Sequence, residues 1–114
     1  MSEITERPWG TYQTIIEESN YKVKIIIDYP KAQLSLHSHN HRSEHWVIVE
    51  GVGTAILDGE TIELKKDDSL HIPVKAQHRM SNFTDKNVVF IEVQNGDYLG
   101  EDDIIRYEDI YGRN

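Results

Sequence analysis

Four residues of types that bind divalent metal ions lie in two segments of the chain. His37, His39 and Glu44 belong to the first segment, and His78 lies far downstream. Successive side chains of a strand point to opposite faces, so histidines two positions apart face the same side and can reach one ion. A nearby carboxylate and a distant histidine complete a set of three or four ligands. The pattern therefore predicts a metal site, although a lone histidine on a strand is usually structural or solvated.

Such a ligand set leaves room for water or substrate, which a catalytic metal requires. Mixed nitrogen and oxygen ligation suits zinc, iron, manganese, cobalt or nickel. We expect one divalent ion, zinc before the others. His41 shares the alternation of His37 and His39. We therefore expect it to point into the same interior, as an acid, a base or an alternative ligand.

The elements that must position these residues are short strands. Stretches rich in β-branched residues or alternating in polarity are separated by turn residues, which is typical of an all-β sandwich or barrel. The expected strands are 22–29, 33–41, 45–50, 54–57, 61–64, 70–72 and 87–93. Asp58-Gly59 predicts a tight hairpin turn, because such turns need positive φ. The tail differs, and we expect one or two helical turns over 102–111.

The composition bounds the kind of protein. With 114 residues, 38% of them apolar, the chain suits one domain spanning 1–114. The absence of cysteine excludes disulfides, iron–sulfur clusters and thiol catalysis. The net charge of −8 disfavours nucleic acid and anionic membranes as partners. No apolar run is long enough to cross a bilayer, and the polar start predicts no signal peptide. We expect a cytoplasmic protein.

The metal-binding pattern resembles the two motifs of the cupin superfamily. The first motif is represented by His37, His39, Glu44 and Gly51, all at the family's spacing. The second motif is represented by Pro73, His78 and Asn82. Lys75 stands where the family usually has glycine, which puts the turn geometry in doubt because glycine alone takes positive φ without a penalty. The resemblance implies a single-domain jelly-roll β-barrel, here with a short helical segment at its C-terminus.

A closer resemblance covers nearly the whole chain. The opening Arg7-Pro8-Trp9-Gly10, the segment His39 to Trp46 and the ending Glu92 to Arg113 are similar to type II phosphomannose isomerase. In that family the domain is commonly the C-terminal half of a bifunctional guanylyltransferase and isomerase. We expect the isomerase activity and not the guanylyltransferase activity. His37 replaces the family's usual glutamine, a change that keeps a metal ligand and could shift metal preference.

The resemblance implies interconversion of mannose 6-phosphate and fructose 6-phosphate through a cis-enediol. Arg42 is our first candidate for a cationic donor that stabilises negative charge on the substrate oxygens. His41 is the first candidate for proton transfer, Glu44 the second if it does not bind metal, and Asp102 the third. The segment 98–103 is either a polar turn or a flap over the barrel mouth.

The phosphate needs charged donors at the barrel mouth, and arginine suits phosphate because its planar fork pairs with two oxygens. The candidates are Arg79 and Arg106, with Lys75 and Arg113 behind them. Tyr98, or Tyr12, is expected to line the sugar pocket. Exposed cationic residues are most often only solvated, which is the alternative for each of these.

Two other functions stay open. One is a related cupin enzyme that acts on another sugar phosphate or a nucleotide sugar, and the other is a non-catalytic sugar-binding module. A homodimer is expected, because a domain this small buries little surface by itself. Trp9 or Trp46 near a barrel edge is a candidate for the interface.

Overall fold

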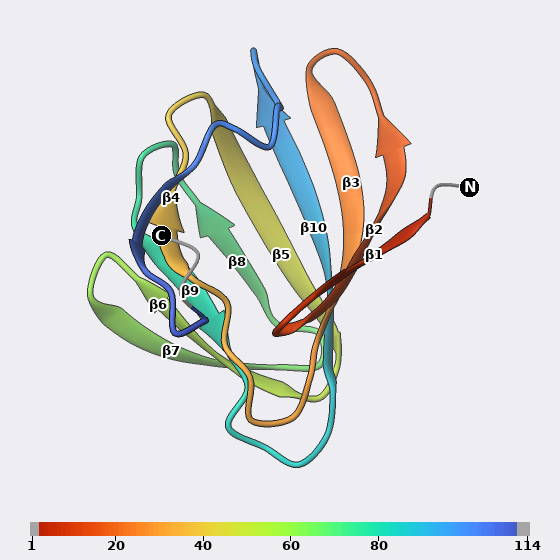
Figure 1. Ribbon diagram of the computed structural model, residues 1–114, viewed down its shortest axis with the longest axis vertical. Helices are drawn as coiled ribbons and strands as arrows, with labels where there is room; N and C mark the ends of the chain where they lie inside the picture. Colours follow the sequence, from red (N-terminus) through yellow and green to blue (C-terminus); the bar gives the residue numbers. More distant parts are fainter. Residues whose placement is uncertain (1–2, 112–114) are drawn as a thin grey trace.

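The computed structural model describes residues 3–111 as two antiparallel sheets that face each other (Figure 1). The six-stranded sheet contains, in spatial order, β1 (Ile4–Arg7), β2 (Gly10–Glu17), β3 (Tyr21–Asp28), β10 (Val88–Gly96), β5 (Arg42–Glu50) and β8 (Ser69–Ile72). The five-stranded sheet contains, in spatial order, β11 (Ile105–Glu108), β4 (Leu36–Ser38), β9 (His78–Ser81), β6 (Val52–Leu57) and β7 (Glu60–Lys65). This arrangement confirms the all-β expectation.

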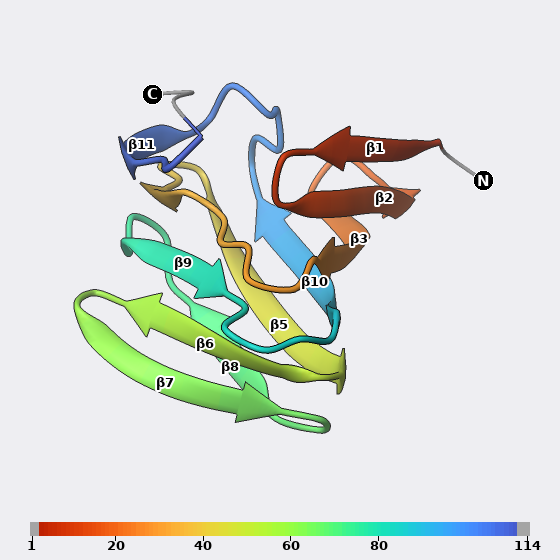
Figure 2. The ribbon, with the colours of Figure 1, turned by 60° about the horizontal axis from the view of Figure 1, so that its bottom comes forward.

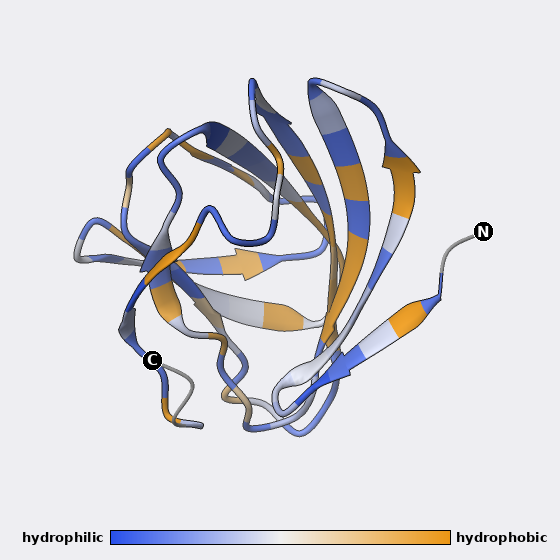
Figure 3. Cartoon of the chain, turned by 45° about the horizontal axis from the view of Figure 1, so that its top comes forward, coloured by the Kyte–Doolittle hydropathy of each residue, from blue (hydrophilic) through white to orange (hydrophobic). Residues whose placement is uncertain are grey.

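Alternating polarity explains why the central strands have one buried face. Along β3 every second residue is buried, and β10 and β5 follow the same rule. Figure 3 shows hydrophilic and hydrophobic bands alternating along several strands. A slip of one residue would move each side chain to the opposite face, so this pattern sets the register. In that register β10 lies between β3 and β5, with Glu92 opposite both Lys24 and Trp46.

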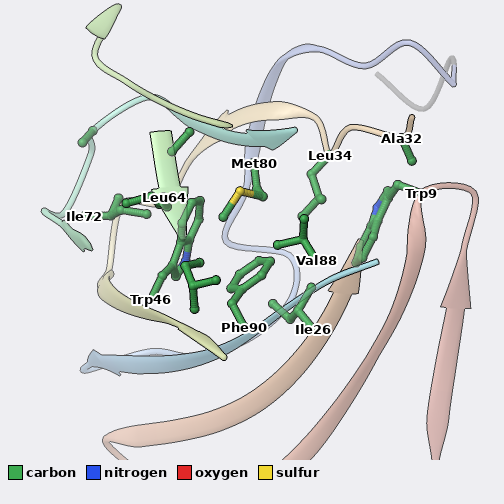
Figure 4. Close-up of a cluster of buried hydrophobic side chains, with 13 residues drawn as sticks. Trp9, Ile26, Ala32, Leu34, Trp46, Leu64, Ile72, Met80, Val88 and Phe90 are labelled. Atoms are coloured by element: carbon green, nitrogen blue, oxygen red, sulfur yellow. The ribbon is translucent and has the colours of Figure 1, made fainter. Parts of the chain in front are cut away.

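The apolar core lies between the sheets and occupies one part of the interior. Trp46, Ile48, Met80, Val88 and Phe90 are almost completely buried. The rings of Trp46 and Phe90 lie 5.1 Å apart at their centroids and pack against the surrounding aliphatic side chains (Figure 4). The core therefore leaves the other part of the interior, towards β4 and β11, for polar residues.

The hairpin predicted at Asp58-Gly59 is confirmed. These residues join β6 to β7 with φ angles of 47° and 85°. Lys75 also has a positive φ of 73°, and its amide donates to the carbonyl of His39 at 2.8 Å. The conformation that glycine favours is thus adopted by lysine here, in a turn that supports a proposed ligand.

The predicted C-terminal helix is wrong. Residues 105–108 form β11, which pairs with β4 so that Arg106 lies opposite His37 and Ile105 opposite Ser38. The Tyr107 and Ser38 hydroxyl groups are hydrogen-bonded at 2.9 Å. Hydrogen bonding to β4 therefore outweighed the helical preference expected from the local sequence. Strands β1, β2 and β9 were not predicted either.

The expected strand over 33–41 is much shorter in the structure. Only Leu36–Ser38 is a strand, and Gln33 makes an isolated bridge to Ser81. The amides of Asn40 and His41 donate to the Asp103 carboxylate, at 3.0 and 2.9 Å, instead of to another strand. The alternation therefore ends before His41. Among residues 3–111 there is no helix that could span a membrane.

Candidate metal centre

Three histidines from two neighbouring strands meet at the polar end of the interior. His37 lies in β4 opposite His78, the first residue of β9, and His39 follows β4 directly. One ring nitrogen from each histidine can be chosen so that all lie within 4.8 Å of one another. The structure thus brings together the three imidazoles that the sequence pattern predicted.

The remaining ring nitrogens are engaged by the protein. Nδ1 of His39 lies 2.6 Å from the Asp103 carbonyl oxygen, and Nδ1 of His78 lies 3.0 Å from the Ala76 carbonyl oxygen. A carbonyl oxygen can only accept, so both Nδ1 atoms carry a proton, and Nε2 is the nitrogen of each ring that these contacts leave unused. Nδ1 of His37 lies 2.6 Å from the Ser35 hydroxyl. Partners of this kind fix the orientation of metal-binding imidazoles.

The carboxylate of Glu44 lies beside two of the imidazoles. Its Oε2 is 3.2 Å from Nε2 of His39, and its Oε1 is 3.6 Å from Nε2 of His78. The Arg42 guanidinium donates to Oε2 at 2.9 to 3.0 Å, and the Trp46 indole donates to Oε1 at 3.1 Å. The carboxylate is therefore held in place next to His39 and His78.

The protonation states suit a metal ligand set. Burial alone would raise the pKa of Glu44, but its hydrogen bond with His39 and the charges of His78 and Arg42 hold it well below the usual range. Burial lowers the pKa of His37 and of His78, so both rings are neutral at neutral pH. The buried Nε2 of His78 has no hydrogen-bond partner among the described residues. Neutral imidazoles with a free lone pair and an ionised carboxylate fit a divalent cation.

A cavity of about 140 Å³ opens beside this cluster between the two sheets. Trp9, Tyr12, Ile26, Leu34 and Ile104 supply apolar and aromatic parts of its lining. The charged side chains that line it are Arg7, Lys24, Arg42, Arg106, Glu44, Glu92 and Glu101. Four cations therefore face three carboxyl groups, although the chain as a whole carries a charge of −8. This local balance suits an anionic ligand.

Glu92 is a cavity residue that the sequence did not single out. It accepts hydrogen bonds from the Trp46 indole at 3.1 Å and from the Gln94 amide at 2.7 Å. Burial, together with the charge of Glu44, raises the pKa of Glu92 to about 8. The sequence signal that could have identified Glu92 is a charged residue at a position of an apolar strand where the alternation places side chains inside the barrel. The same signal marks Lys24 on β3.

His41 does not share the wall of His37 and His39, so that prediction is wrong. Its side chain is exposed and lies 3.7 Å from the Asp97 carboxylate. Asp102 accepts a hydrogen bond from the Tyr98 hydroxyl, and this bond raises the pKa of Tyr98. These three residues line a separate surface hollow, not the cavity beside the histidines. The structure thus places His41, Asp102 and Tyr98 away from the histidine cluster.

The predicted phosphate donors separate in the structure. Arg106 on β11 lines the cavity, as expected for a substrate-binding residue. Arg79 is buried and donates to the Leu34 carbonyl and to Glu108, so it ties β11 to β9. Lys75 is exposed on its turn and does not line the cavity. Arg113 lies outside the described residues. Arg42, the proposed catalytic cation, does lie in the cavity wall.

The chain has clear relatives among characterised proteins. The family described as Mannose-6-phosphate isomerase C-terminal matches residues 1–109. The alginate biosynthesis protein AlgA of Pseudomonas aeruginosa is 45% identical over 107 residues, which is 94% of this chain and 22% of that protein. The mannose-1-phosphate guanylyltransferase ManC of Salmonella typhimurium is 43% identical, again over 94% of this chain and 22% of its own length. The chain therefore spans a small part of these relatives.

Solved structures show the same fold at low identity. KdgF from Halomonas sp. superposes with a TM-score of 0.79 at 15% identity, covering 88% of this chain and 89% of that one. The capsular polysaccharide assembling protein CapF of Staphylococcus aureus gives 0.80 at 23% identity, covering 94% and 34%. The fold is that of a cupin, and the sequence match over residues 1–109 shows that the chain belongs to the mannose-6-phosphate isomerase C-terminal family.

Proposed function

We propose that this chain is a metal-dependent isomerase that interconverts mannose 6-phosphate and fructose 6-phosphate. One observation carries the proposal: His37 and His39, which cluster with His78, line a cavity in which cationic side chains outnumber carboxyl groups. The metal ligands in this proposal are His37, His39, His78 and Glu44. The family description names the substrate class, and a sugar phosphate substrate agrees with a cytoplasmic protein.

The reaction moves one proton between C2 and C1 of the sugar through a cis-enediol. A bound divalent cation supplies Lewis-acid stabilisation of the charge that develops on the sugar oxygens. Arg42 lies in the cavity wall beside Glu44, so its guanidinium adds a fixed positive charge close to the same oxygens. Its hydrogen bonds to Glu44 position that charge before substrate binds.

Proton transfer needs a group that reaches the sugar carbons. His41 and Asp102 are not at the cavity, and Glu44 belongs to the proposed ligand set. Glu92 lines the cavity, and the Trp46 indole that donates to it also donates to Glu44. We therefore assign the proton transfer to the Glu92 carboxyl group.

The test is exchange of solvent deuterium into C2 of mannose 6-phosphate, followed by NMR. We expect exchange and fructose 6-phosphate formation with a divalent metal, loss of both after chelation, and recovery when metal is added back. Glu92→Gln should lower kcat by about 10²-fold or more with little change in KM. Glu50→Gln, an exposed change of the same kind on β5, serves as the control.

Other outcomes separate the alternative functions. Metal-dependent turnover of a different sugar phosphate or of a nucleotide sugar would show a related cupin enzyme with another substrate. Binding of sugar phosphates without deuterium exchange for any divalent metal would show a binding module. Several relatives carry the names of alginate or xanthan biosynthesis proteins, so the route we propose is the supply of mannose units for a polysaccharide.

A further inference from the structure

Two lysines are buried in the inward phase of β3, beside the cavity. The side chains of Lys22 and Lys24 are only 7% and 6% exposed. Both ammonium groups approach Glu101, at 3.4 Å for Lys22 and at 3.0 to 3.1 Å for Lys24. A buried charge is costly unless it is paired. Glu101 is therefore the anion that stabilises both lysines in the free protein.

The lysines do not depend equally on Glu101. Lys22 also donates to the Leu99 carbonyl at 3.0 Å and lies 3.6 Å from Glu17. Within residues 3–111, the Lys24 ammonium group donates to the Glu101 carboxylate and lies over the face of the Tyr12 ring, 4.3 Å from the ring centroid. Lys24 lines the cavity and Lys22 does not. Lys24 is thus a cavity cation whose ion pair, within the described residues, is with Glu101.

Glu101 itself belongs to an exposed connection between β10 and β11. Its side chain is 54% exposed, whereas the lysines are not. The connection is anchored without it, because the Asp103 carboxylate accepts from the Asn40 and His41 amides and the Leu99 carbonyl accepts from Lys22. The Glu101 side chain can therefore leave Lys24 by a change of rotamer towards solvent while the backbone stays in place.

Two arginines face the same cavity, and neither has a carboxylate partner among residues 3–111. Arg7, at the end of β1, donates to the Glu6 carbonyl and to the Tyr12 hydroxyl. Arg106 pairs with β4 through its backbone, but its guanidinium has no hydrogen bond or ion pair with any residue in the described part of the chain, 3–111. Both β1 and β11 lie at the same end of the barrel (Figure 2). Arginine forks without a carboxylate are the groups that phosphate oxygens pair with best.

We propose that Lys24, Arg7 and Arg106 form the subsite for the phosphoryl group of the substrate, and that Glu101 occupies it until the phosphoryl group displaces its carboxylate. The identity of the ligand as a sugar phosphate rests on the function proposed above. The subsite itself rests on the buried ammonium group, the two arginines and the exposed carboxylate. Glu101 then acts as a competitor that stabilises Lys24 between turnovers and lowers affinity for weak anions.

The test measures binding of inorganic phosphate by isothermal titration calorimetry at low salt. The proteins compared are wild type, Glu101→Gln, Glu17→Gln, Lys24→Met and Arg106→Gln. Glu17→Gln is the matched control. It also removes one negative charge beside a buried lysine, Lys22, but Glu17 lies outside the cavity. If Glu101 covers Lys24 roughly nine-tenths of the time, its removal tightens phosphate binding by about tenfold. Lys24→Met should weaken binding by about tenfold or more.

The results divide clearly. Tighter binding by Glu101→Gln, an unchanged constant for Glu17→Gln and weaker binding by Arg106→Gln support the subsite. Equal or weaker binding by Glu101→Gln overturns it, and so does the same gain from Glu17→Gln. Arg106 is exposed, so Arg106→Gln and the two glutamine variants decide the outcome even if Lys24→Met does not fold. The same titrations after removal of metal by a chelator should rank the variants' phosphate affinities in the same order, because none of these residues is a proposed metal ligand.

A comparison of sugars keeps this proposal separate from the isomerase. Wild type should bind mannose 6-phosphate at least about tenfold more tightly than glucuronate, whose carboxylate offers fewer acceptor oxygens. Equal affinity for glucuronate would overturn the phosphoryl assignment. If the order among variants holds but no isomerisation occurs, the subsite stands and the isomerase proposal fails. If isomerisation occurs without that order, the subsite fails alone.

Discussion

At the scale of single residues, the chemistry of the site depends on which atoms are already engaged. Backbone carbonyls hold Nδ1 of His39 and of His78, so Nε2 is the atom that remains for a ligand bond. Glu44 is ionised within the cluster, whereas the nearby Glu92 has a pKa of about 8. Two carboxyl groups in one cavity thus hold different protonation states, because Glu44 has cationic and imidazole neighbours and Glu92 is mainly desolvated.

The placement of His41 predicts that it is dispensable. Its ring lies 6.0 Å from that of Tyr98 and beside Asp97, on the outer hollow. We expect His41→Asn to leave kcat/KM for mannose 6-phosphate within about twofold of wild type, since no contact with the reacting atoms is lost. Steady-state kinetics would check this. A decrease in kcat/KM as large as that expected for Glu92→Gln would show that His41 takes part in catalysis.

Asp28 predicts a dependence of stability on pH. It is fully buried, both of its carboxylate oxygens lack a hydrogen-bond partner among residues 3–111, and burial raises its pKa from 3.8 to about 8. Between these two values the folded state binds a proton that the unfolded state has lost. The free energy of unfolding therefore falls as pH rises from about 4 to about 8, with Glu92 adding to the same trend.

The variant Asp28→Asn isolates this effect. Asparagine has no carboxyl group to ionise, so the difference in unfolding free energy between the variant and wild type should shift in favour of the variant by about 1.4 kcal/mol for each pH unit within that range. Urea unfolding at pH 5, 6, 7 and 8 measures it. A pH-independent difference would contradict the raised pKa.

At the scale of elements, the site is assembled by strands distant in sequence. β4 and β9 supply the histidines, β5 supplies Arg42 and Glu44, and β3 and β10 supply Lys24 and Glu92. β1 and β11 bring Arg7 and Arg106 to the cavity. β11 is held by Arg79, whose guanidinium donates to the side chain of Glu108 at 2.7 Å and to its carbonyl at 3.2 Å. Arg79 therefore fixes the position of β11, from which Arg106 reaches the cavity.

Arg79→Met should separate this structural role from phosphate binding. The change removes hydrogen bonds of a buried charged group and leaves the Leu34 and Glu108 carbonyls without that donor, so we expect a loss of about 1–3 kcal/mol of stability. Urea unfolding measures the loss. Glu108→Gln, at an exposed side chain that keeps its backbone bond, should cost at most about 1 kcal/mol. Equal costs for both variants would contradict the buried anchor.

At the scale of the whole molecule, the outer face of the six-stranded sheet is apolar in its centre. The apolar residues that point outward from the three central strands are Val23, Ile25, Ile27, Val89, Ile91, Val93, Val47 and Val49. Tyr21, Ser43, His45 and Asn95 continue the same face at one end of these strands. No charged residue lies among them in a chain of net charge −8, so a second copy can approach here with the least repulsion. Trp9 and Trp46 are buried within the barrel, so their side chains are not part of this face.

We therefore expect the homodimer to form through this face. An isologous contact uses the same patch of both subunits. A single substitution in the patch therefore places a charge on both sides of the interface. Val47→Glu should convert the dimer to a monomer, and Val74→Glu, an equally exposed valine on the turn after β8, should not. Sedimentation equilibrium measures both. A monomeric wild type, or a Val47→Glu variant that remains dimeric, would contradict the expectation.

The sequence alone determined the features that depend on neighbouring residues. Alternating polarity predicted most of the central strands, Asp58-Gly59 predicted a turn, and the spacing of His37, His39 and His78 predicted a cluster that the structure assembles. Each of these follows from the two-residue period of a strand or from the conformational freedom of one residue. The family resemblance was likewise carried by the order of residues along the chain.

Only the tertiary structure decided where distant segments meet. Asp103 captures the amides of Asn40 and His41, and this ends the alternation that had placed His41 inside. Pairing with β4 made the tail a strand, and its packing turned Arg79 into an anchor while Arg106 reached the cavity. Lys24, Glu92 and Glu101 come together from three separate segments. Local periodicity specifies which face a side chain takes, but only long-range pairing specifies what it faces.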